Sequence, residues 1–363
     1  MVYVCILGLV FTCTTGVAST DYGLACMLAG QFILAIQFIL LQNPLRELRH
    51  ERDHVAPEKL PFWRRTYWAL CVLFSSRGIG WTYQIPHLLP RPSTPRREFA
   101  YQQVVKAVWW YLIVDLGRAY QHSNRLFFRD AADLFGEGFP GYLHRCVNIV
   151  AFLGPMISIT GVMYCLIAAV FVTLGWSPPR DWPHVYGNWA DSYTVRRFWG
   201  RTYHQNFRRC TAAVGKGCCR LLGLTPGSWA SSYTQLYVGF ATSGFMHCVG
   251  DLVVNPMLFG TSFPFFIAQA VAISLEDAAI GVARRIGLQS RYPAHLWRML
   301  GYAWVVLWFS VSAPWFIVAS LRVGALSPVS FSLIAMLSSR MEHVLRNQLL
   351  LAIAVTKLQP AEM

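Results

Sequence analysis

Charged residues are scarce in this chain. They make up 13% of its 363 residues, about half of the roughly 25% that soluble domains carry. Hydrophobic residues account for 55% and aromatic residues for 15%. Such a composition excludes intrinsic disorder, because disordered chains have too little apolar surface to bury a core. It also argues against a water-soluble globule and indicates a protein that lies in a membrane.

The sequence also lacks several common functional motifs. It has no Walker loop, Gly-rich dinucleotide turn, serine elbow or H-E-x-x-H sequence, so nucleotide-driven transport and triad hydrolysis lose their usual support. The ten cysteines show no C-x-x-C pair and no metal-ligand spacing, and we assign none to a metal site, a disulfide framework or catalysis. We predict no bound metal.

The charge that is present lies in basic islands. The chain has 31 Lys and Arg against 17 Asp and Glu, a net charge of +14. Two islands, residues 46–65 and 180–220, stand between apolar runs, which is the pattern of cytoplasmic loops under the positive-inside rule. Nucleic-acid binding needs a basic patch on an ordinary polar surface. We therefore predict the lipid bilayer as a partner and no nucleic acid.

The uncharged runs predict the fold. A spanning helix needs about 20 largely apolar residues, and about eight segments approach that length. We therefore predict an all-α, polytopic membrane bundle that forms a single domain over residues 1–363. The candidate spans are residues 2–20, 22–45, 146–179, 221–250, 252–275, 299–321, 323–339 and a weak 347–356, with two short, doubtful segments at 66–81 and 104–114. Segment 2–20 lacks the basic start of a signal peptide, so it is expected to pair with 22–45 as a retained hairpin.

Topology tests this assignment. If the islands 46–65 and 180–220 both face the cytoplasm, an even number of crossings separates them. Three candidates lie between them: 66–81, 104–114 and 146–179. One of them should therefore not span the membrane. We expect it to be one of the two short segments, which contain Arg77 and Lys106. The run 146–179 is longer than the bilayer requires, so it should tilt, kink at Pro155 or begin outside.

His247 is the one histidine deep within an uncharged run. An ionisable side chain in the membrane is a site hypothesis by default. In helical spacing it shares a face with Gly239, Ser243 and Asp251, so the Asp251 carboxylate, one turn on, could orient the imidazole. The small residues allow close helix packing or leave room for a ligand. From these residues alone, an equal alternative is that His247 only bonds a neighbouring helix.

Two further stretches combine polar and apolar residues. The segment RRFWGRTYHQNFRR (196–209) suits an interfacial helix whose Arg forks bind a polyphosphate, or else a surface helix attracted to anionic lipids. The segment 267–277 brings Gln269, Glu276 and Asp277 into an apolar run. Acids at the bilayer centre cost about 2.5–3.5 kcal/mol on insertion scales. These two should end the helix or face the interior, paired with Arg284 or Arg285.

Together these features resemble a known family. FWGRTYHQNFRR is similar to the FWGRRWHQ signature of the wax synthase-like branch of membrane-bound O-acyltransferases. About 40 residues later follow an apolar segment with a histidine, FATSGFMH, and then FFIAQAVAISLED. The upstream WPHVYG resembles the W-P-x-x-F/Y-G of fungal members that acylate terpenoid hydroxyls. Tyr203 departs from the usual Trp. Which of His204, Gln205 and Asn206 takes the polar role beside the histidine stays open.

The resemblance implies transfer of an acyl group from a coenzyme A thioester to an alcohol. His247 would be the general base, with His204 and Asn206 holding the thioester carbonyl or the histidine. The residues implied in binding coenzyme A are Arg196, Arg197, Trp199, Arg201, Gln205, Arg208 and Arg209. Residues 180–220 would form a cytoplasmic basic loop and 221–282 the helices with the catalytic histidine. The partners are an acyl-CoA and a hydrophobic alcohol, without a permanently bound cofactor.

Among fungal members the resemblance favours an acetyltransferase that uses acetyl-CoA on a terpenoid or meroterpenoid of secondary metabolism, in the endoplasmic reticulum. Three alternatives are weighed. A wax ester synthase would use long-chain acyl-CoA. A transporter usually shows related halves, and none is present. A terpene cyclase would use acids as proton donors, and it leaves FWGRTYHQ unexplained; the available acids are Asp115, Asp251, Glu276 and Asp277.

Overall fold

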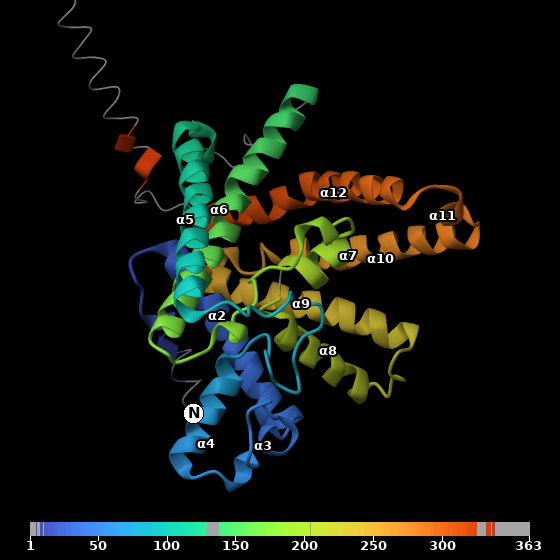
Figure 1. Ribbon diagram of the computed structural model, residues 1–363. Helices are drawn as coiled ribbons and strands as arrows, with labels where there is room; N and C mark the ends of the chain where they lie inside the picture. Colours follow the sequence, from blue (N-terminus) through green and yellow to red (C-terminus); the bar gives the residue numbers. More distant parts are fainter. Residues whose placement is uncertain are drawn as a thin grey trace, which may run out of the picture. The chain divides into compact units, whose positions relative to one another are not determined.

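The computed structural model describes Cys5 and residues 8–9, 11–128, 138–203, 205–324, 332–334 and 336–337. Within these ranges the secondary structure is helical (Figure 1), apart from one isolated antiparallel bridge between His50 and Trp81. The predicted all-α class is therefore confirmed. The chain forms two compact units, one of Met1–Tyr101 with Ala168–Ser327 and one of Gln102–Ile167 with Pro328–Met363. The predicted single domain stays a prediction.

Five helices in the described residues are long and apolar enough to cross a membrane. They are α2 (Ala18–Ile36) with its π-helical extension η1 (Gln37–Leu41), α6 (Gly138–Thr173), α9 (Trp229–Val254), α10 (Phe263–Arg285) preceded by η8 (Pro256–Leu258), and α12 (Ala294–Arg322). The predicted count of about eight is not confirmed. Predicted spans 2–20 and 323–339 lie partly, and 347–356 wholly, outside the described residues.

The two short segments, 66–81 and 104–114, form different structures. Segment 66–81 contributes to α4 (Phe62–Phe74), whose 13 residues reach only about 20 Å, and the chain then turns at Gly78 and Gly80, both with positive φ. A helix of that length does not cross a hydrocarbon core of about 30 Å. Segment 104–114 lies inside the 28-residue α5 (Arg96–Ser123), which is not one of the five apolar helices.

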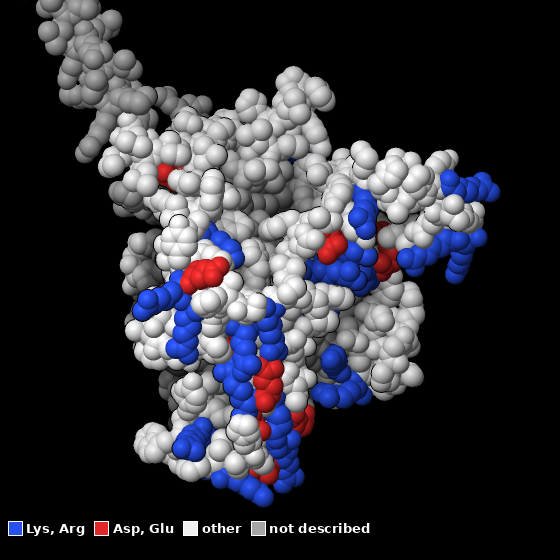
Figure 2. All heavy atoms as spheres, in the orientation of Figure 1, with Lys and Arg blue, Asp and Glu red and all other residues white. Residues whose placement is uncertain are grey.

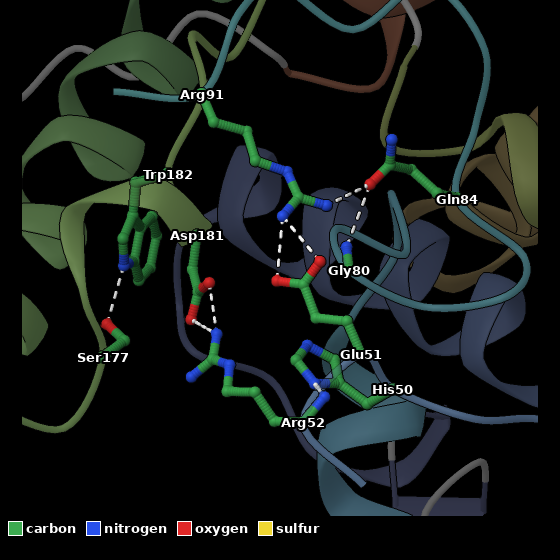
Figure 3. A network of polar contacts seen from close by, with 9 residues as sticks. All are labelled: His50, Glu51, Arg52, Gly80, Gln84, Arg91, Ser177, Asp181 and Trp182. Atoms are coloured by element: carbon green, nitrogen blue, oxygen red, sulfur yellow. Dashed lines mark hydrogen bonds and ion pairs between the residues drawn. The ribbon is translucent and has the colours of Figure 1, made fainter. Parts of the chain in front are cut away.

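The two basic islands lie against each other. Arg52 pairs with both carboxylate oxygens of Asp181, and the buried Arg77 donates to the carbonyls of Pro183 and His184 at 3.2 and 2.7 Å. Figure 3 shows the Arg52 pair beside a second one, in which Arg91 contacts Glu51. Islands 46–65 and 180–220 therefore occupy the same side of the first unit, as predicted.

Helix α9 is the centre of the first unit, where α2, α8 (Arg208–Leu221) and α10 all pack against it (Figure 1). Glycines permit the close approaches. A Cβ on Gly250 would lie 2.7 Å from Cys26 Sγ of α2, and one on Gly244 would lie 2.7 Å from the Phe263 ring of α10. Small residues of α9 therefore serve close helix packing at these two positions, whereas a Cβ on Gly239, on the predicted face, would meet Thr211 only at 3.8 Å.

Short helices connect these elements in the first unit. They are α3 (Pro44–Glu47), η2 (Pro57–Lys59), η5 (Pro179–Asp181), η6 (Trp189–Asp191), α7 (Val195–Arg197), the π-helix η7 (Phe198–Tyr203) and α11 (Leu288–Arg291). Val195 of α7 is buried with Ile273 of α10 and Val305 of α12. This apolar cluster fixes the segment 195–203 against the two spanning helices.

In the second unit, α5 and α6 are joined by polar contacts, with η3 (Arg125–Phe128) between them. Tyr120 donates to Asn148 Oδ1 at 2.8 Å, and Gln121 donates to the Ala151 carbonyl at 2.6 Å. Gly117 lies directly against the ring of Pro155. Pro155, the predicted kink, is inside α6, which runs for 36 residues.

Candidate active site

The imidazole of His247 is held from one side. It is half-buried on α9, and its Nδ1 lies 2.7 Å from the Tyr22 hydroxyl of α2. The Phe266 ring stacks on it at 4.6 Å, and the Phe316 ring meets it edge-on at 5.5 Å. Within the described part of the chain no residue hydrogen-bonds its Nε2. The ring is therefore oriented through one nitrogen, and the other remains available.

Asp251 does not orient His247 directly, and that prediction is wrong. Its Oδ2 accepts hydrogen bonds from the Ser262 hydroxyl at 2.7 Å and the Ser262 backbone N–H at 3.3 Å. The side chain is 1% exposed, and its Oδ1 has no hydrogen-bond partner among the described residues. The bond to a neighbouring helix, the alternative interpretation of His247, is present through Tyr22, but it occupies only one ring nitrogen.

The acidic pair Glu276 and Asp277 of α10 holds α7 in place. Glu276 is buried, and its Oε2 accepts from the Val195 N–H at 2.6 Å and from the Trp304 indole at 3.0 Å. Asp277 pairs with the guanidinium of Arg196. Glu276 thus faces the interior as predicted. The predicted partners Arg284 and Arg285 are wrong, because the backbone N–H of Val195 and the Arg196 side chain come closer to these carboxylates.

The segment 196–209 is not one continuous interfacial helix, so that expectation is wrong. It consists of the end of α7, the π-helix η7, a turn and the start of α8. π-helical turns are rare and concentrate at functional sites. The upstream WPHVYG segment packs against the π-helix η7, where the Gly187 N–H donates to the Thr202 carbonyl at 3.0 Å. A Cβ on Gly187 would overlap the Arg201 carbonyl oxygen, so only glycine fits there.

Four of the five arginines predicted to bind coenzyme A contact the protein itself. Arg196 pairs with Asp277, and Arg197 lies 3.9 Å from Asp191 with its guanidinium over the Tyr193 ring. Arg208 donates to the Gly200 carbonyl at 2.5 Å. Arg209 is buried, donates to the Val72 carbonyl at 3.0 Å and stacks 3.5 Å over Tyr83. Arg201 makes no side-chain hydrogen bond or ion pair with any described residue.

The other polar residues of the motif have separate environments. Gln205 is buried and donates to the Arg201 carbonyl at 2.8 Å, while its Oε1 has no partner in the described chain. Asn206 is half-buried, and its side chain makes no hydrogen bond with a described residue. His204 lies outside the described residues. The roles predicted for these three stay predictions.

Aromatic rings connect the motif with His247. The indole of Trp199 donates to the buried Gln269 Oε1 at 3.3 Å, and its ring lies 6.2 Å from Phe265. Phe265 contacts Phe266 at 5.2 Å, and Phe266 stacks on His247. The structure therefore links Trp199 to His247 through Phe265 and Phe266, whereas the sequence only gives their order along the chain.

A basic cleft of about 610 Å³ lies along one face of α8. Its charged lining residues are Glu47, Arg208, Arg209, Lys216 and Arg220. Burial lowers the pKa of the Arg208 and Arg209 guanidinium groups. Lys216 and Arg220 form no hydrogen bond or ion pair with a described residue, so their charges are free to meet an anion. In Figure 2 basic side chains gather over α8 and over α3 with its neighbouring loops.

The cleft reaches α9 at Gln235, which is one of its lining residues. His247 lies 12 residues further along the same helix, about 18 Å at 1.5 Å per residue. An anion in the cleft would therefore be separated from the available Nε2 by the length of an extended linker. Sequence reasoning did not single out Lys216 and Arg220. A signal was available, because Arg208, Ala212, Lys216 and Arg220 recur every four residues and would lie on one helix face.

Comparisons with known proteins identify the family of this chain. A model of the membrane bound O-acyl transferase family matches residues 182–268, which include the motif and His247. Acetyltransferase ple2 of Rhodocybe pseudopiperita is 36% identical over 305 residues, covering 83% of this chain and 78% of that protein. The chain belongs to the membrane-bound O-acyltransferase family.

Two further relatives are similar over comparable lengths. Acetyltransferase eriL of Hericium erinaceus is 30% identical, covering 81% of this chain and 77% of its own. Acetyltransferase TRI7 of Fusarium sporotrichioides is 28% identical, covering 74% and 67%. No solved structure is significantly similar. The resemblance predicted from the motifs is thus confirmed. The family and the apolar helices together indicate an acyltransferase that is an integral membrane protein.

Proposed function

We propose that this O-acyltransferase transfers acetyl from acetyl-CoA to a hydroxyl group of a terpenoid or meroterpenoid. The observation that carries the proposal is the state of His247, which is half-buried in a spanning helix with Nδ1 engaged and Nε2 unpartnered in the described chain. A base that acts on an apolar alcohol needs this setting, and imidazole, with an ordinary pKa of about 6.5, suits proton transfer near neutral pH.

In the proposed reaction, His247 Nε2 takes the hydroxyl proton while the alcohol oxygen attacks the thioester carbon. The tetrahedral intermediate then collapses, the C–S bond breaks, and the imidazolium returns its proton to the thiolate. The products are an ester and free coenzyme A. A donor beside the thioester oxygen would stabilise the intermediate by about 3–4 kcal/mol. His204, Gln205 and Asn206 remain the candidates for that donor.

Coenzyme A would bind with its phosphates in the cleft along α8. Arg208 lines the cleft, and Lys216 and Arg220 there have no partner in the described chain. The pantetheine arm would then extend along α9 toward His247. Arg201, which makes no side-chain hydrogen bond or ion pair with a described residue, is a further cation that could contact the phosphates. Arg196 and Arg197 would act differently, by holding α7 to α10 and to the loop at Asp191.

The acceptor would reach His247 from the bilayer, because an apolar alcohol concentrates there, whereas acyl-CoA arrives from the cytosol. The endoplasmic reticulum, the location expected from the resemblance, is part of this proposal. Microsomes that contain the protein should release free thiol from acetyl-CoA only after a hydroxylated terpenoid is added. The variant His247→Ala should abolish this release, and His295→Ala, at an exposed position of α12, should retain it.

Full activity of the His247→Ala variant would contradict the proposed mechanism. A donor series from acetyl-CoA to palmitoyl-CoA tests the acyl group, since a wax ester synthase would prefer the long chain. Thiol release with palmitoyl-CoA and a fatty alcohol, without release from acetyl-CoA, would replace the acetyltransferase proposal by the wax ester alternative. Absence of any thiol release with either acceptor class would contradict both.

A further inference from the structure

Tyr22 contacts the one nitrogen of His247 that is bonded. The two residues lie 225 positions apart in the sequence, and the distance from Tyr22 Oη to His247 Nδ1 is 2.7 Å. Gly250 makes this approach possible, since a Cβ there would lie 2.8 Å from the Tyr22 ring. Tyr22 is on α2, outside the segment that the family model matches.

The direction of this hydrogen bond decides whether His247 can act as a base. A neutral imidazole carries one proton, on either Nδ1 or Nε2. If the Tyr22 hydroxyl donates to Nδ1, the proton sits on Nε2, and Nε2 cannot accept another. If Nδ1–H donates to the Tyr22 oxygen, the lone pair of Nε2 is free. Only the second arrangement gives a base on the side that the described chain leaves open.

The base proposed above requires the second arrangement, and the neighbouring groups permit it. Asp251, when ionised, only accepts hydrogen bonds, so the Ser262 hydroxyl at 2.7 Å must donate to it. Because this proton is used, the Ser262 oxygen can only accept a further hydrogen bond. A Tyr22 hydroxyl that donates toward it would keep its own oxygen lone pairs for His247 Nδ1–H. The unpartnered Oδ1 of Asp251 leaves further acceptor capacity beside this chain.

We propose that Tyr22 is a positioning residue, which together with Ser262 and Asp251 holds His247 in the tautomer with an unprotonated Nε2. When Nε2 takes the alcohol proton, the same chain keeps its direction, and the carboxylate of Asp251 stabilises the imidazolium without itself receiving a proton. The inference rests on the proposed function, in which His247 is the general base. It adds residues of α2 and of the α9–α10 connection to the site.

The test separates orientation from folding and from substrate binding. In Tyr22→Phe the ring stays and only the hydroxyl is lost. We expect kcat to fall about 10- to 100-fold, as for other partners that orient a histidine, while KM for acetyl-CoA and for the alcohol stays the same. Asp251→Asn should lower kcat similarly, and the double variant should lose no more than the stronger single one, because both act through one imidazole.

One matched variant serves as the control. Tyr233→Phe also removes a phenol–carboxylate hydrogen bond, to Asp277 at 3.0 Å, but far from His247 along the same helix. It should keep kcat within about twofold. Thermal unfolding of each purified variant in detergent checks that the protein is folded.

The outcomes distinguish failure of this inference from failure of the proposed function. An inactive His247→Ala with a fully active, folded Tyr22→Phe overturns this inference and leaves the proposed function intact. A fully active His247→Ala overturns the proposed function first. If Tyr22→Phe does not fold, Ser262→Ala carries the same test, and an unchanged kcat in that variant overturns the inference. Additive losses in the Tyr22→Phe, Asp251→Asn double variant also contradict it, since they require two independent roles.

Discussion

Arg52 and Asp181 form an ion pair across 129 residues of sequence, in which one guanidinium nitrogen contacts both carboxylate oxygens. The two residues belong to the two basic islands. An exposed ion pair of this kind contributes little to stability, typically about 0–1 kcal/mol. The ion pair instead indicates the topology, because segments that touch through charged side chains lie on the same side of a membrane.

This contact predicts which positions a membrane-impermeant maleimide labels in sealed microsomes. Lys59→Cys and Arg180→Cys, one in each island and both exposed, should react without permeabilisation. Met257→Cys, 89% exposed in the connection after α9, should react only after detergent is added, because α9 separates it from the islands. Labelling of the unchanged protein gives the background from the native cysteines. Protection of either island position would refute the shared side.

A pH dependence follows from the network around His50 in Figure 3. Burial, followed by the charge of Arg52, lowers the pKa of His50 from its ordinary 6.5. The unfolded chain therefore binds this proton more readily than the folded one, so stability is complete above about pH 6.5 and falls as the pH drops through the folded pKa. The hydrogen bond from Arg91 lowers the pKa of Glu51, which adds a further loss at more acidic pH.

The measurement is the unfolding temperature in detergent at pH 7.5, 6.5 and 5.5. The parent protein should lose more stability on acidification than His50→Gln, which cannot take up the proton. Other histidines titrate in both proteins, so the difference between the two curves is the quantity of interest. Parallel curves would show that His50 has the same pKa folded and unfolded.

The long helices could be predicted from the sequence because each is an uninterrupted apolar run. The predicted span 299–321 lies within α12, and its ends differ from those of the helix by only a few residues. The start of α9 was placed too early, at residue 221, because the apolar run continues through a turn with Gly223 and Gly227, and Ser228 then caps the helix by accepting from the Ser231 N–H. Hydropathy records burial in lipid, not where the backbone turns.

The site was predictable only in part, for a related reason. His247 stood out because an ionisable residue in an apolar run is rare. Tyr22 gave no comparable signal, since a tyrosine in such a run is common and its partner lies on another helix. The partner of Glu276 was misassigned because nearby arginines in the sequence are not the nearest donors in space. Contacts between distant helices depend on packing, which local patterns do not encode.

The docking of Gly187 on the π-helix can be tested by adding a single methyl group. In Gly187→Ala the new Cβ would meet the Arg201 carbonyl oxygen and lie 3.0 Å from its carbon. Because these are backbone atoms, the segment must shift, and we expect a loss of about 1–3 kcal/mol together with reduced activity. Unfolding temperature and specific activity measure the two effects.

The matched control is Gly200→Ala, within the π-helix itself. A Cβ there has no neighbour within 4 Å, so the free energy of unfolding should change by no more than about 0.5 kcal/mol. Equal behaviour of the two variants would show that the WPHVYG segment does not depend on the fit at Gly187. A loss confined to Gly187→Ala ties the upstream segment to the position of the motif.

The free cations of the cleft should determine the affinity for the acyl donor. Hydrogen bonds to charged groups contribute about 1.5–3 kcal/mol, so Lys216→Ala or Arg220→Ala should raise KM for acetyl-CoA about tenfold or more, with kcat and KM for the alcohol unchanged. The wild-type KM should itself rise with salt, because exposed charges are screened within about 8 Å at physiological ionic strength. Arg285→Ala, an exposed cation at the end of α10 outside the cleft, serves as the control.

The decisive comparison uses S-acetylpantetheine, a donor that has the thioester and the arm but lacks the nucleotide phosphates. With this donor the Lys216→Ala and Arg220→Ala variants should match the unchanged protein, since the anion that these side chains contact is absent. If the variants are impaired equally with both donors, their effect is on the fold or on the arm, and the phosphates bind elsewhere. If KM for acetyl-CoA is unchanged in the double variant, the cleft along α8 is not the coenzyme A site.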